Sequence, residues 1–332
     1  MPVFNHTDDL KTMLNSILDN SYQYWELLAV DDGSDEETKE VLKQYATQDK
    51  RINIIQRERE PKGAQTCRNL GFEQARGEYI VFFDSDDYVA PYCLEQRVKE
   101  LSEHPELDFM VFRSGTYYDG QFHTEEHKMS FGYPIYKDDI AAFSSRILPF
   151  IVWNNIYRRS SLLTINAVWD VNLLSLQDSD FNIQTLANGL QYSYSVCPPD
   201  YGYRINVGSG NISGNIITQK HHASHLYGLQ KLYSTIVKRY GNRYNQELFY
   251  AALFTLNLLS RVGDVTASSE VYKIVREYSS TYARFIWLQA KCYAALRKIL
   301  PTEFARKIAF APYLIISSKQ TNDKITKLKL FK

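Results

Sequence analysis

The chain has 332 residues, of which 44% are hydrophobic and 14% aromatic, enough for one large domain or two ordinary ones with a substantial core. No run of about 18 apolar residues predicts a membrane-spanning helix, and no signal peptide is visible at the start. The cysteines are too scattered for a metal-type pair or a disulfide framework: Cys67, Cys93, Cys197 and Cys292. We therefore expect a protein of the reducing cytoplasm.

The formal net charge of zero hides a strong asymmetry. Residues 221–332 carry 18 Lys and Arg against 6 Asp and Glu, whereas residues 1–220 carry 20 against 32. Two interpretations stand. The two parts are differently solvated faces of one protein, or an acidic, metal-using catalytic part precedes a tail that prefers anionic surfaces.

The first 110 residues alternate helix and strand signals. In chain order they predict a helix over 7–18 capped by Thr7, a strand over 27–30, a helix opened by the capping box Ser34 to Glu37, a strand over 51–56, a helix over 63–75, a strand over 79–83, a helix after Pro91 and a strand over 108–115. Such alternation is typical of an α/β fold, with a mostly parallel sheet covered by helices on both faces.

The rest of the chain divides in two. Residues 115–220 are less regular, with many aromatic residues and one predicted helix over 138–148, whereas the pattern is helical from residue 221 onward. We therefore predict a nucleotide-binding and catalytic domain over 1–220 and a basic helical C-terminal region over 221–332.

The apolar run 79–83 ends in a cluster of carboxylates, Asp84, Asp86 and Asp87. Carboxylates at positions i and i+2 after a buried strand can face one hard cation, and oxygen ligands suit both Mg²⁺ and Mn²⁺. Clustered carboxylates repel each other unless positive charge lies among them. The alternative is a solvated acidic turn without a metal.

Three further positions offer chemistry. Asp31 and Asp32 end the second predicted strand, where a carboxylate can accept from a nucleobase N–H or a ribose hydroxyl; a plain strand-to-helix turn is the alternative. Arg68 lies in the helix before the acidic strand and could reach a pyrophosphate, or be a surface arginine. Asp178, followed by Asp180, is either a helix N-cap or a general base.

Taken together and in order, these segments resemble glycosyltransferase family 2, the inverting transferases with the GT-A fold. The matching stretches span roughly residues 1–215: "MPVFN", "WELLAVDDGSDEET", "PKGAQTCRNLGFEQARGEYIVFFDSDDYVAP", "FIVWNNIYRRSSL", "LSLQDSDFNIQTLANG" and "DYGYRIN". The string from Gly63 to Asp87 is the most specific of them.

The resemblance implies a role for each matching position. It implies a nucleotide-sugar site of Pro2, Phe4, Asn5, Asp31, Asp32, Arg68, Asp84, Ser85 and Asp86, a metal held by Asp84 and Asp86, a catalytic base at Asp178, and an acceptor side with Trp153, Asn154 and Asp180. Gln177 stands where the family usually has Glu before the base.

The resemblance also implies the reaction. A hydroxyl deprotonated by Asp178 attacks the anomeric carbon of a nucleotide-diphosphate sugar, with UDP the expected nucleotide and Mn²⁺ or Mg²⁺ the cofactor. The expected acceptor is a saccharide or lipid-linked saccharide in cell-surface polysaccharide biosynthesis. Nucleic acid is not an expected partner. The alternatives are transfer to a polyprenyl phosphate and a degenerate, non-catalytic protein that binds nucleotide sugars.

Two regions depart from the family pattern or lie outside it. Family members usually begin with a strand several residues upstream of Met1, so we expect the true start to lie upstream. No Q-x-x-R-W motif occurs, which favours one sugar added per acceptor visit. Residues 285–300 predict a basic amphipathic helix, and two interpretations of the tail stand: a packed bundle, or a segment over 285–332 that docks on an anionic membrane at the inner face of the cell.

Overall fold

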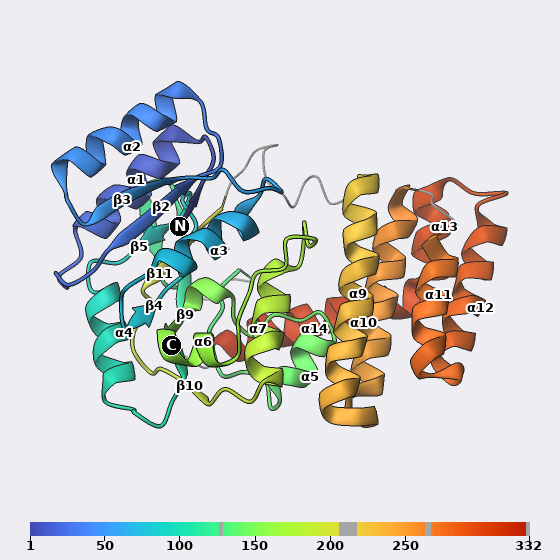
Figure 1. Cartoon of the computed structure of the whole chain (residues 1–332). Helices are drawn as coiled ribbons and strands as arrows, with labels where there is room; N and C mark the ends of the chain where they lie inside the picture. The colour runs from blue at the N-terminus through green and yellow to red at the C-terminus, as the bar shows by residue number, and fades with distance from the viewer. Residues whose placement is uncertain (126–128, 206–217, 263–266, 330–332) are drawn as a thin grey trace.

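The computed structural model describes residues 1–125, 129–205, 218–262 and 267–329, and Figure 1 shows strands and helices in the first part and helices in the second. The strands are β1 (Pro2–Val3), β2 (Leu27–Asp31), β3 (Ile52–Gln56), β4 (Tyr79–Ile80), β5 (Tyr88–Val89), β6 (Phe109–Val111), β7 (Ser114–Tyr118), β8 (Gln121–His123), β9 (Asn155–Arg158), β10 (Tyr192–Tyr194) and β11 (Tyr201–Arg204). The helices of the first part are α1 (Thr7–Leu18), α2 (Glu36–Gln48), α3 (Ala64–Gln74), α4 (Cys93–Ser102), α5 (Asp139–Ser144), α6 (Arg159–Thr164) and α7 (Gln177–Ala187).

The strands fall into three hydrogen-bonded groups. The first, in the order β1-β2-β3, is parallel throughout, and Pro2 of β1 pairs with Val30 of β2. The second has the order β10-β6-β9-β4, in which β9 runs antiparallel to both neighbours. The third has the order β5-β11-β7-β8. The predicted α/β architecture is present, with the carboxyl ends of β1 and β2 at one edge.

A cavity of about 580 Å³ lies between the first and second groups, bordered by β2 and β4. Apolar side chains line much of it, among them Leu27, Phe72 and Ile80. The strand that we predicted over 79–83 is regular only over Tyr79–Ile80, because β4 is an edge strand whose ladder to β9 ends there. The acidic turn after residue 83 therefore follows a segment without regular secondary structure, not a strand.

Two predicted helix caps are wrong by one residue. The N-cap of α1 is His6, and Thr7 begins the helix with its hydroxyl 3.0 Å from that of Thr38. The N-cap of α2 is Asp35, whose carboxylate accepts from the Thr38 N–H, so Ser34 and Glu37 form no capping box. The Thr7 hydroxyl thus contacts α2 and does not cap its own helix, whereas α2 keeps a local cap one residue later than predicted.

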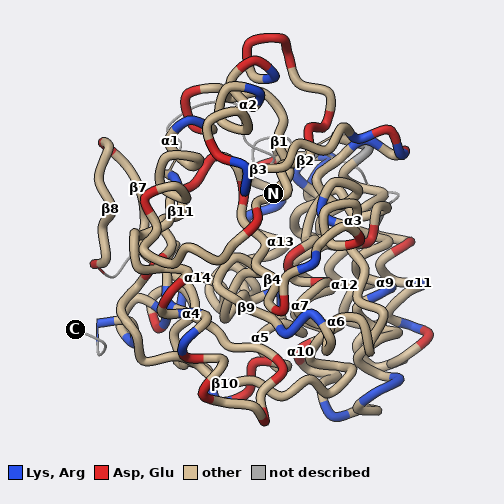
Figure 2. The backbone as a smooth tube through the Cα atoms, turned by 60° about the vertical axis from the view of Figure 1, so that its left-hand side comes forward, with Lys and Arg blue, Asp and Glu red and all other residues tan. Residues whose placement is uncertain are grey.

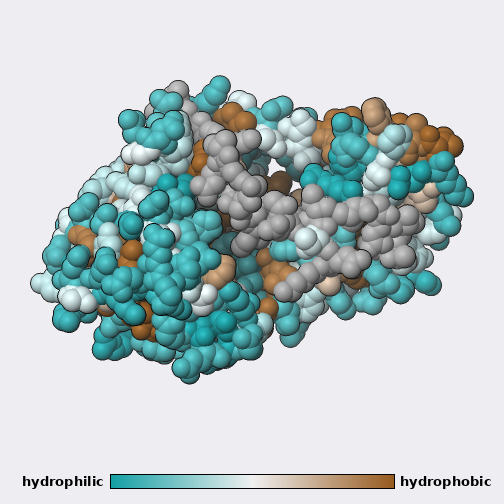
Figure 3. Space-filling model, turned by 90° about the horizontal axis from the view of Figure 1, so that it is seen from above, coloured by the Kyte–Doolittle hydropathy of each residue, from teal (hydrophilic) through white to brown (hydrophobic). Residues whose placement is uncertain are grey.

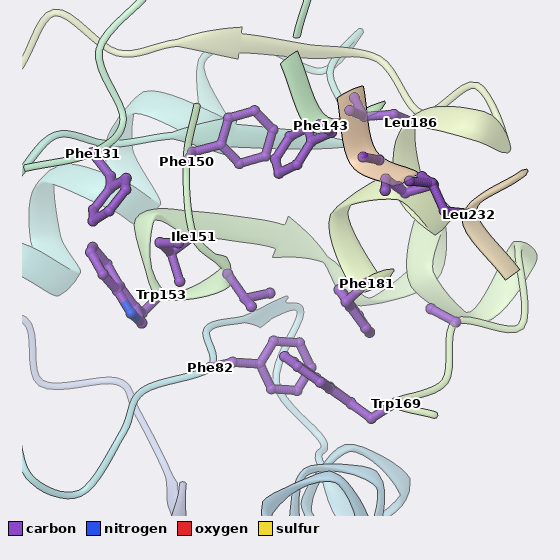
Figure 4. Close-up of a cluster of buried hydrophobic side chains, with 14 of the residues drawn as sticks. Phe82, Phe131, Phe143, Phe150, Ile151, Trp153, Trp169, Phe181, Leu186 and Leu232 are labelled. Carbon is purple, nitrogen blue, oxygen red and sulfur yellow. The ribbon is translucent and has the colours of Figure 1, made fainter. Parts of the chain in front are cut away.

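An aromatic cluster links the segments that carry the expected site residues (Figure 4). Phe82 lies 5.4 Å from both Trp169 and Phe181, measured between ring centroids, and Trp169 stacks on Phe181 at 4.5 Å. Phe82 comes two residues before Asp84, and Phe181 comes three residues after Asp178. Close packing of such rings leaves little freedom, so this core fixes the acidic turn relative to the start of α7.

The second part consists of helices that pack on the first. They are α9 (Gln219–Tyr240), α10 (Asn245–Leu259), α11 (Ala267–Tyr278), α12 (Ser280–Leu296), α13 (Thr302–Ala309) and α14 (Ala311–Leu328). Figure 1 shows α14 running back to the α/β part, where the Lys324 ammonium lies 3.9 Å from the centroid of the Phe131 ring. One buried cluster runs from Val3 to Phe310. Over the described residues, no helix is long and apolar enough to span a membrane.

Candidate functional site

The first site residues lie at the carboxyl end of β2. Asp31 is fully buried, and its Oδ1 accepts a 2.9 Å hydrogen bond from the Ser34 N–H. Its Oδ2 is buried and has no partner among the described residues. Asp32 instead pairs with Arg57 and accepts a 3.3 Å hydrogen bond from the Gly63 N–H. Asp31 therefore offers a free acceptor, whereas Asp32 holds the turn at Gly63.

The loop after β1 lies against the loop after β2. The Asn5 N–H donates to Ser34 Oγ at 3.1 Å, and the Asp35 N–H donates back to Asn5 Oδ1 at 2.9 Å. Asn5 has a φ of 56°, a left-handed conformation that Asn tolerates better than most residues. The Phe4 ring is 45% exposed, with the Lys62 ammonium 3.6 Å from its centroid. An exposed ring beside Asp31 suits stacking against a flat base.

Arg68 connects the acidic turn to the start of α7. Its guanidinium pairs with Asp84, donates to Gln177 Oε1 at 3.0 Å and lies 4.4 Å from the centroid of the Trp169 ring. The side chain is only 8% exposed. Sequence reasoning assigned Arg68 to a pyrophosphate; in this structure it neutralises a carboxylate and orders Gln177, and its contact with a nucleotide stays a prediction.

Two of the three carboxylates in the acidic turn, Asp86 and Asp87, have different surroundings. Burial, and then the charge of Asp84, raise the pKa of Asp86 to about 6. Asp87 is 2% exposed and accepts hydrogen bonds from the Tyr201 hydroxyl at 2.6 Å and the Arg204 N–H at 2.7 Å. Burial and the neighbouring carboxylates raise the pKa of Asp87. Asp87 is therefore an anchor to β11, which leaves Asp84 and Asp86 to face a ligand.

Asp178 is the second residue of α7, so the N-cap role that we considered for it is wrong: Leu176 is the N-cap. Asp178 Oδ1 is buried and has no partner among the described residues. Burial raises its pKa to about 6, although the nearby Arg68 lowers it and Asp84 raises it further. A carboxylate with a free oxygen and a pKa near neutrality suits a general base.

Helix α9 forms hydrogen bonds with residues on both sides of Asp178 in the sequence. Lys231 of α9 donates to Asp170 at 2.7 Å and to Asp180 at 2.8 Å. Ser224 Oγ, also on α9, accepts a 2.9 Å hydrogen bond from the Leu174 N–H. Sequence reasoning assigned Asp180 to the acceptor side, but its carboxylate is engaged by Lys231 and Gln184. Asp180 therefore holds α7 to α9 in this structure.

The other two expected acceptor-side residues are buried. Trp153 is 4% exposed and stacks on Tyr201, with ring centroids 4.5 Å apart. Asn154 is fully buried; its Oδ1 accepts from the Ile151 N–H, and its Nδ2 donates to the Phe112 carbonyl, each at 2.8 Å. In this structure Asn154 therefore supports the sheet through these internal partners, and its contact with an acceptor stays a prediction.

Arg204 is a site residue to which sequence reasoning gave no role. It follows the stretch "YGY" of β11, pairs with Asp9 at 3.2 Å and donates from Nε to the Asp86 carbonyl. Its Nη2 is buried and has no partner among the described residues. The signal in the sequence was a basic residue at the end of a short aromatic strand, which is too common to be diagnostic.

The buried side-chain atoms without a partner in the described part of the chain include Asp31 Oδ2, Asp178 Oδ1 and Arg204 Nη2, which belong to the candidate site. Buried polar atoms in proteins nearly always have partners, so such atoms at a candidate site are consistent with a ligand. The two Asp oxygens can accept hydrogen bonds from N–H or O–H groups of a ligand. The Arg204 Nη2 atom can donate to an anionic group of the same ligand.

The acidic turn fits a divalent cation that completes its coordination from a ligand. Asp84 and Asp86 flank Ser85, and Asp84 lies close enough for its charge to raise the pKa of Asp86. No group of three or more His, Cys, Asp or Glu side chains in a metal-binding arrangement occurs in the described part of the chain. Mg²⁺ typically binds one or two carboxylates together with phosphate oxygens and water, so two carboxylates suffice.

Comparison with known sequences finds similar chains among bacterial glycosyltransferases. Glycosyltransferase EpsH of Bacillus subtilis is 28% identical over 212 residues, which cover 62% of this chain and 60% of EpsH. The teichuronic acid biosynthesis glycosyltransferase TuaG of Bacillus subtilis is 37% identical over 113 residues, or 34% of this chain and 41% of TuaG. The matches thus span about two fifths to three fifths of these relatives.

The fold is also that of a solved structure. The crystal structure of S. aureus TarS 1–349 in complex with UDP-GlcNAc superposes with a TM-score of 0.66 at 16% identity, covering 99% of this chain and 89% of that one. The GT-A fold expected from the resemblance is confirmed. The sequence profile of Glycosyl transferase family 2 matches residues 1–165, which carry the acidic turn and the loops after β1 and β2. This chain belongs to glycosyltransferase family 2.

Proposed function

We propose that the protein is an inverting glycosyltransferase that moves a sugar from a UDP-sugar to a hydroxyl of a saccharide or lipid-linked saccharide. The observation that carries the proposal is the buried, unpartnered Asp178 Oδ1 near the Asp84–Asp86 turn and the free Asp31 Oδ2. TarS, which shares the fold, was crystallised with UDP-GlcNAc, and the relative TuaG is named for teichuronic acid biosynthesis. Both support a donor of this class and a role in cell-surface polysaccharide biosynthesis.

The donor would lie along the edge from β2 to the acidic turn. A uracil ring has one N–H donor beside its carbonyl groups, and Asp31 Oδ2 offers it an acceptor while the exposed Phe4 ring offers a stacking face. The diphosphate would lie near Arg204, whose free Nη2 can donate to a phosphate oxygen. This order leaves the sugar nearest to Asp178.

Asp84 and Asp86 would hold a divalent cation, Mn²⁺ or Mg²⁺. When bound, such an ion supplies positive charge that stabilises a departing diphosphate. The two carboxylates orient the site, and Arg68 keeps Asp84 in place through its ion pair.

Asp178 would accept the proton of the acceptor hydroxyl as that oxygen attacks the anomeric carbon. With a pKa of about 6, the carboxylate is mostly ionised at neutral pH and yet more basic than an ordinary aspartate. This basicity favours a neutral hydroxyl acceptor over a polyprenyl phosphate. A phosphate monoester has its second pKa near 6 and arrives largely ionised, so it needs no base.

A donor panel tests the proposal without a known acceptor. The purified protein is incubated with UDP-sugars and Mn²⁺, the released UDP is measured with water as the acceptor, and proton NMR reports the configuration of the released sugar. We expect release from one donor, with inverted configuration at early times, and loss of release in Asp178→Asn but not in the matched variant Asp108→Asn. Release with retained configuration, or equal release by Asp178→Asn, would refute the assigned mechanism.

A further inference from the structure

The outward face of α12 exposes large apolar side chains to solvent, and no other described element covers it. Six large hydrophobic side chains on α12, α13 and the turn between them are at least half exposed: Phe285 (54%), Trp287 (52%), Leu288 (59%), Ile299 (78%), Phe304 (63%) and Ile308 (54%). The opposite side of α12 packs inward through Ala283, Ile286 and Tyr293. Figure 3 shows hydrophobic surface gathered at the end of the molecule that the C-terminal helices form. We call this set the α12–α13 face.

Cations accompany this apolar surface. Arg284, Lys291 and Lys298 recur every seven residues along α12 and the turn after it, and all three are exposed. The Lys291 ammonium lies 5.6 Å from the centroid of the Trp287 ring. Between Glu277 and Glu303 the sequence has no Asp or Glu. Long cationic side chains beside apolar ones extend their charge outward while their methylene groups lie along the apolar surface.

We propose that the α12–α13 face docks on the surface of an anionic lipid bilayer, with α12 lying in the headgroup region. Exposed Trp and Phe among Lys and Arg are what an interfacial helix presents to such a surface. A second copy of this chain is a poorer partner, because a two-fold interface places the same surface patch on both sides and would bring the Arg284, Lys291 and Lys298 rows together. The anionic partner supplies the charge that this face lacks.

Cosedimentation of the full-length protein with vesicles tests this. One set is phosphatidylcholine alone, and the other contains about one third phosphatidylglycerol. We expect binding to the anionic set that weakens as salt rises, since each surface cation contributes roughly 5-fold to partitioning and is screened by ions. The double variant Arg284→Gln and Lys291→Gln should lose roughly 25-fold. Trp287→Ser with Leu288→Ser should lose about 10-fold or more, because apolar burial anchors the helix.

Matched controls lie far from the face. Lys43→Gln with Lys50→Gln removes two exposed cations of the α/β part, and Tyr24→Ser with Val196→Ser removes exposed apolar groups that are 86% and 81% accessible. Both should bind vesicles as the unaltered protein does. Circular dichroism checks that every variant is folded. If folded protein ignores anionic vesicles, or the controls lose as much binding as the face variants, the proposal is wrong.

A label at Cys292 gives an independent readout. Cys292 is exposed between Leu288 and Ala295, whereas Cys67 and Cys93 are buried. With Cys197 replaced by Ser, a polarity-sensitive fluorophore on Cys292 should shift to the blue when anionic vesicles are added. No shift on vesicles that carry the protein would overturn the assigned face. Sedimentation velocity without lipid is the remaining arm: a dimer that Trp287→Ser abolishes would show that the face joins copies of the chain instead.

Discussion

Replacing Asp178 with Asn should stabilise the protein while it removes activity, and the stabilisation should depend on pH. Burial raises the pKa of this carboxyl from an ordinary 3.8 to about 6. The folded state therefore binds the proton more tightly than the unfolded state, and the contribution of this group to stability is greatest below pH 3.8 and is lost as pH rises through about 6. Above that pH the ionised side chain costs about 3 kcal/mol of folding free energy.

Asn cannot ionise, so it escapes this cost. At pH 5 the same pKa values give a cost of only about 1.6 kcal/mol. Comparing the two pH values cancels any constant difference between Asn and protonated Asp. Urea unfolding at pH 8 and pH 5 should therefore show Asp178→Asn gaining about 1.4 kcal/mol more, relative to the unaltered protein, at the higher pH.

Asp170 provides a control whose pKa is shifted in the opposite direction. Burial acts against ionisation there, but hydrogen bonds from Lys231, the Asn172 N–H and Tyr227 outweigh it and lower the pKa of Asp170. That stability is present above the unfolded pKa of about 3.8 and is lost only as pH falls below it, so Asp170→Asn should cost nearly the same at pH 8 and at pH 5. If Asp178→Asn changes the stability of the protein equally at both pH values, the raised pKa that we assign to the proposed base is refuted.

Three more predictions concern the site. Asp86→Asn should abolish the increase in UDP affinity that Mn²⁺ produces. A thermal-shift assay detects this, because a ligand at 100 times its Kd adds about 2.7 kcal/mol to the free energy of unfolding. An undiminished effect of the metal would contradict the assigned metal ligands. The rate of transfer should rise with pH through an apparent value of about 6, as Asp178 loses its proton, and a rate independent of pH from 5 to 8 would exclude it as the base. Lys231→Met should lower kcat about 10-fold or more with donor KM little changed, because the Lys231 ammonium holds Asp180 and α7 in position. The control is Lys238→Met, which replaces an exposed lysine of the same helix. Equal effects of the two substitutions would refute a positioning role for Lys231.

The parts of the fold that local pattern dictates were predictable. The alternation of apolar strands with amphipathic helices predicted the α/β order of the first 110 residues. Helix α1 has its predicted bounds because Leu10, Met13, Leu14 and Ile17 recur at helical spacing and are all buried. Signals of this kind depend only on residues close together in the sequence.

The sequence was a poor guide where residues far apart in the chain determine the local contacts. Ser34 and Asp35 are both residue types that favour the N-cap position. Asp35 is the N-cap of α2, because the Ser34 hydroxyl already accepts a hydrogen bond from the Asn5 N–H. The sequence also did not show that Asp84 and Gln177, the latter 109 residues away, hold the Arg68 guanidinium. The contact of Arg68 with a pyrophosphate stays a prediction.

The surroundings of Asp180 also depend on a distant residue. The resemblance implied an acceptor-side position for Asp180, and in the structure Lys231, 51 residues further along, engages its carboxylate. A contact of Asp180 with an acceptor stays a prediction. Nothing in the sequence near Asp180 announces that partner, because α9 lies outside every motif that we recognised.

A crystal structure with a UDP-sugar and Mn²⁺ tests the central claim most directly. The account predicts the uracil N–H on Asp31 Oδ2, the diphosphate and the ion at Asp84 and Asp86, and the anomeric carbon facing Asp178 Oδ1. A nucleotide bound instead in the cavity between β2 and β4, away from these carboxylates, would contradict it.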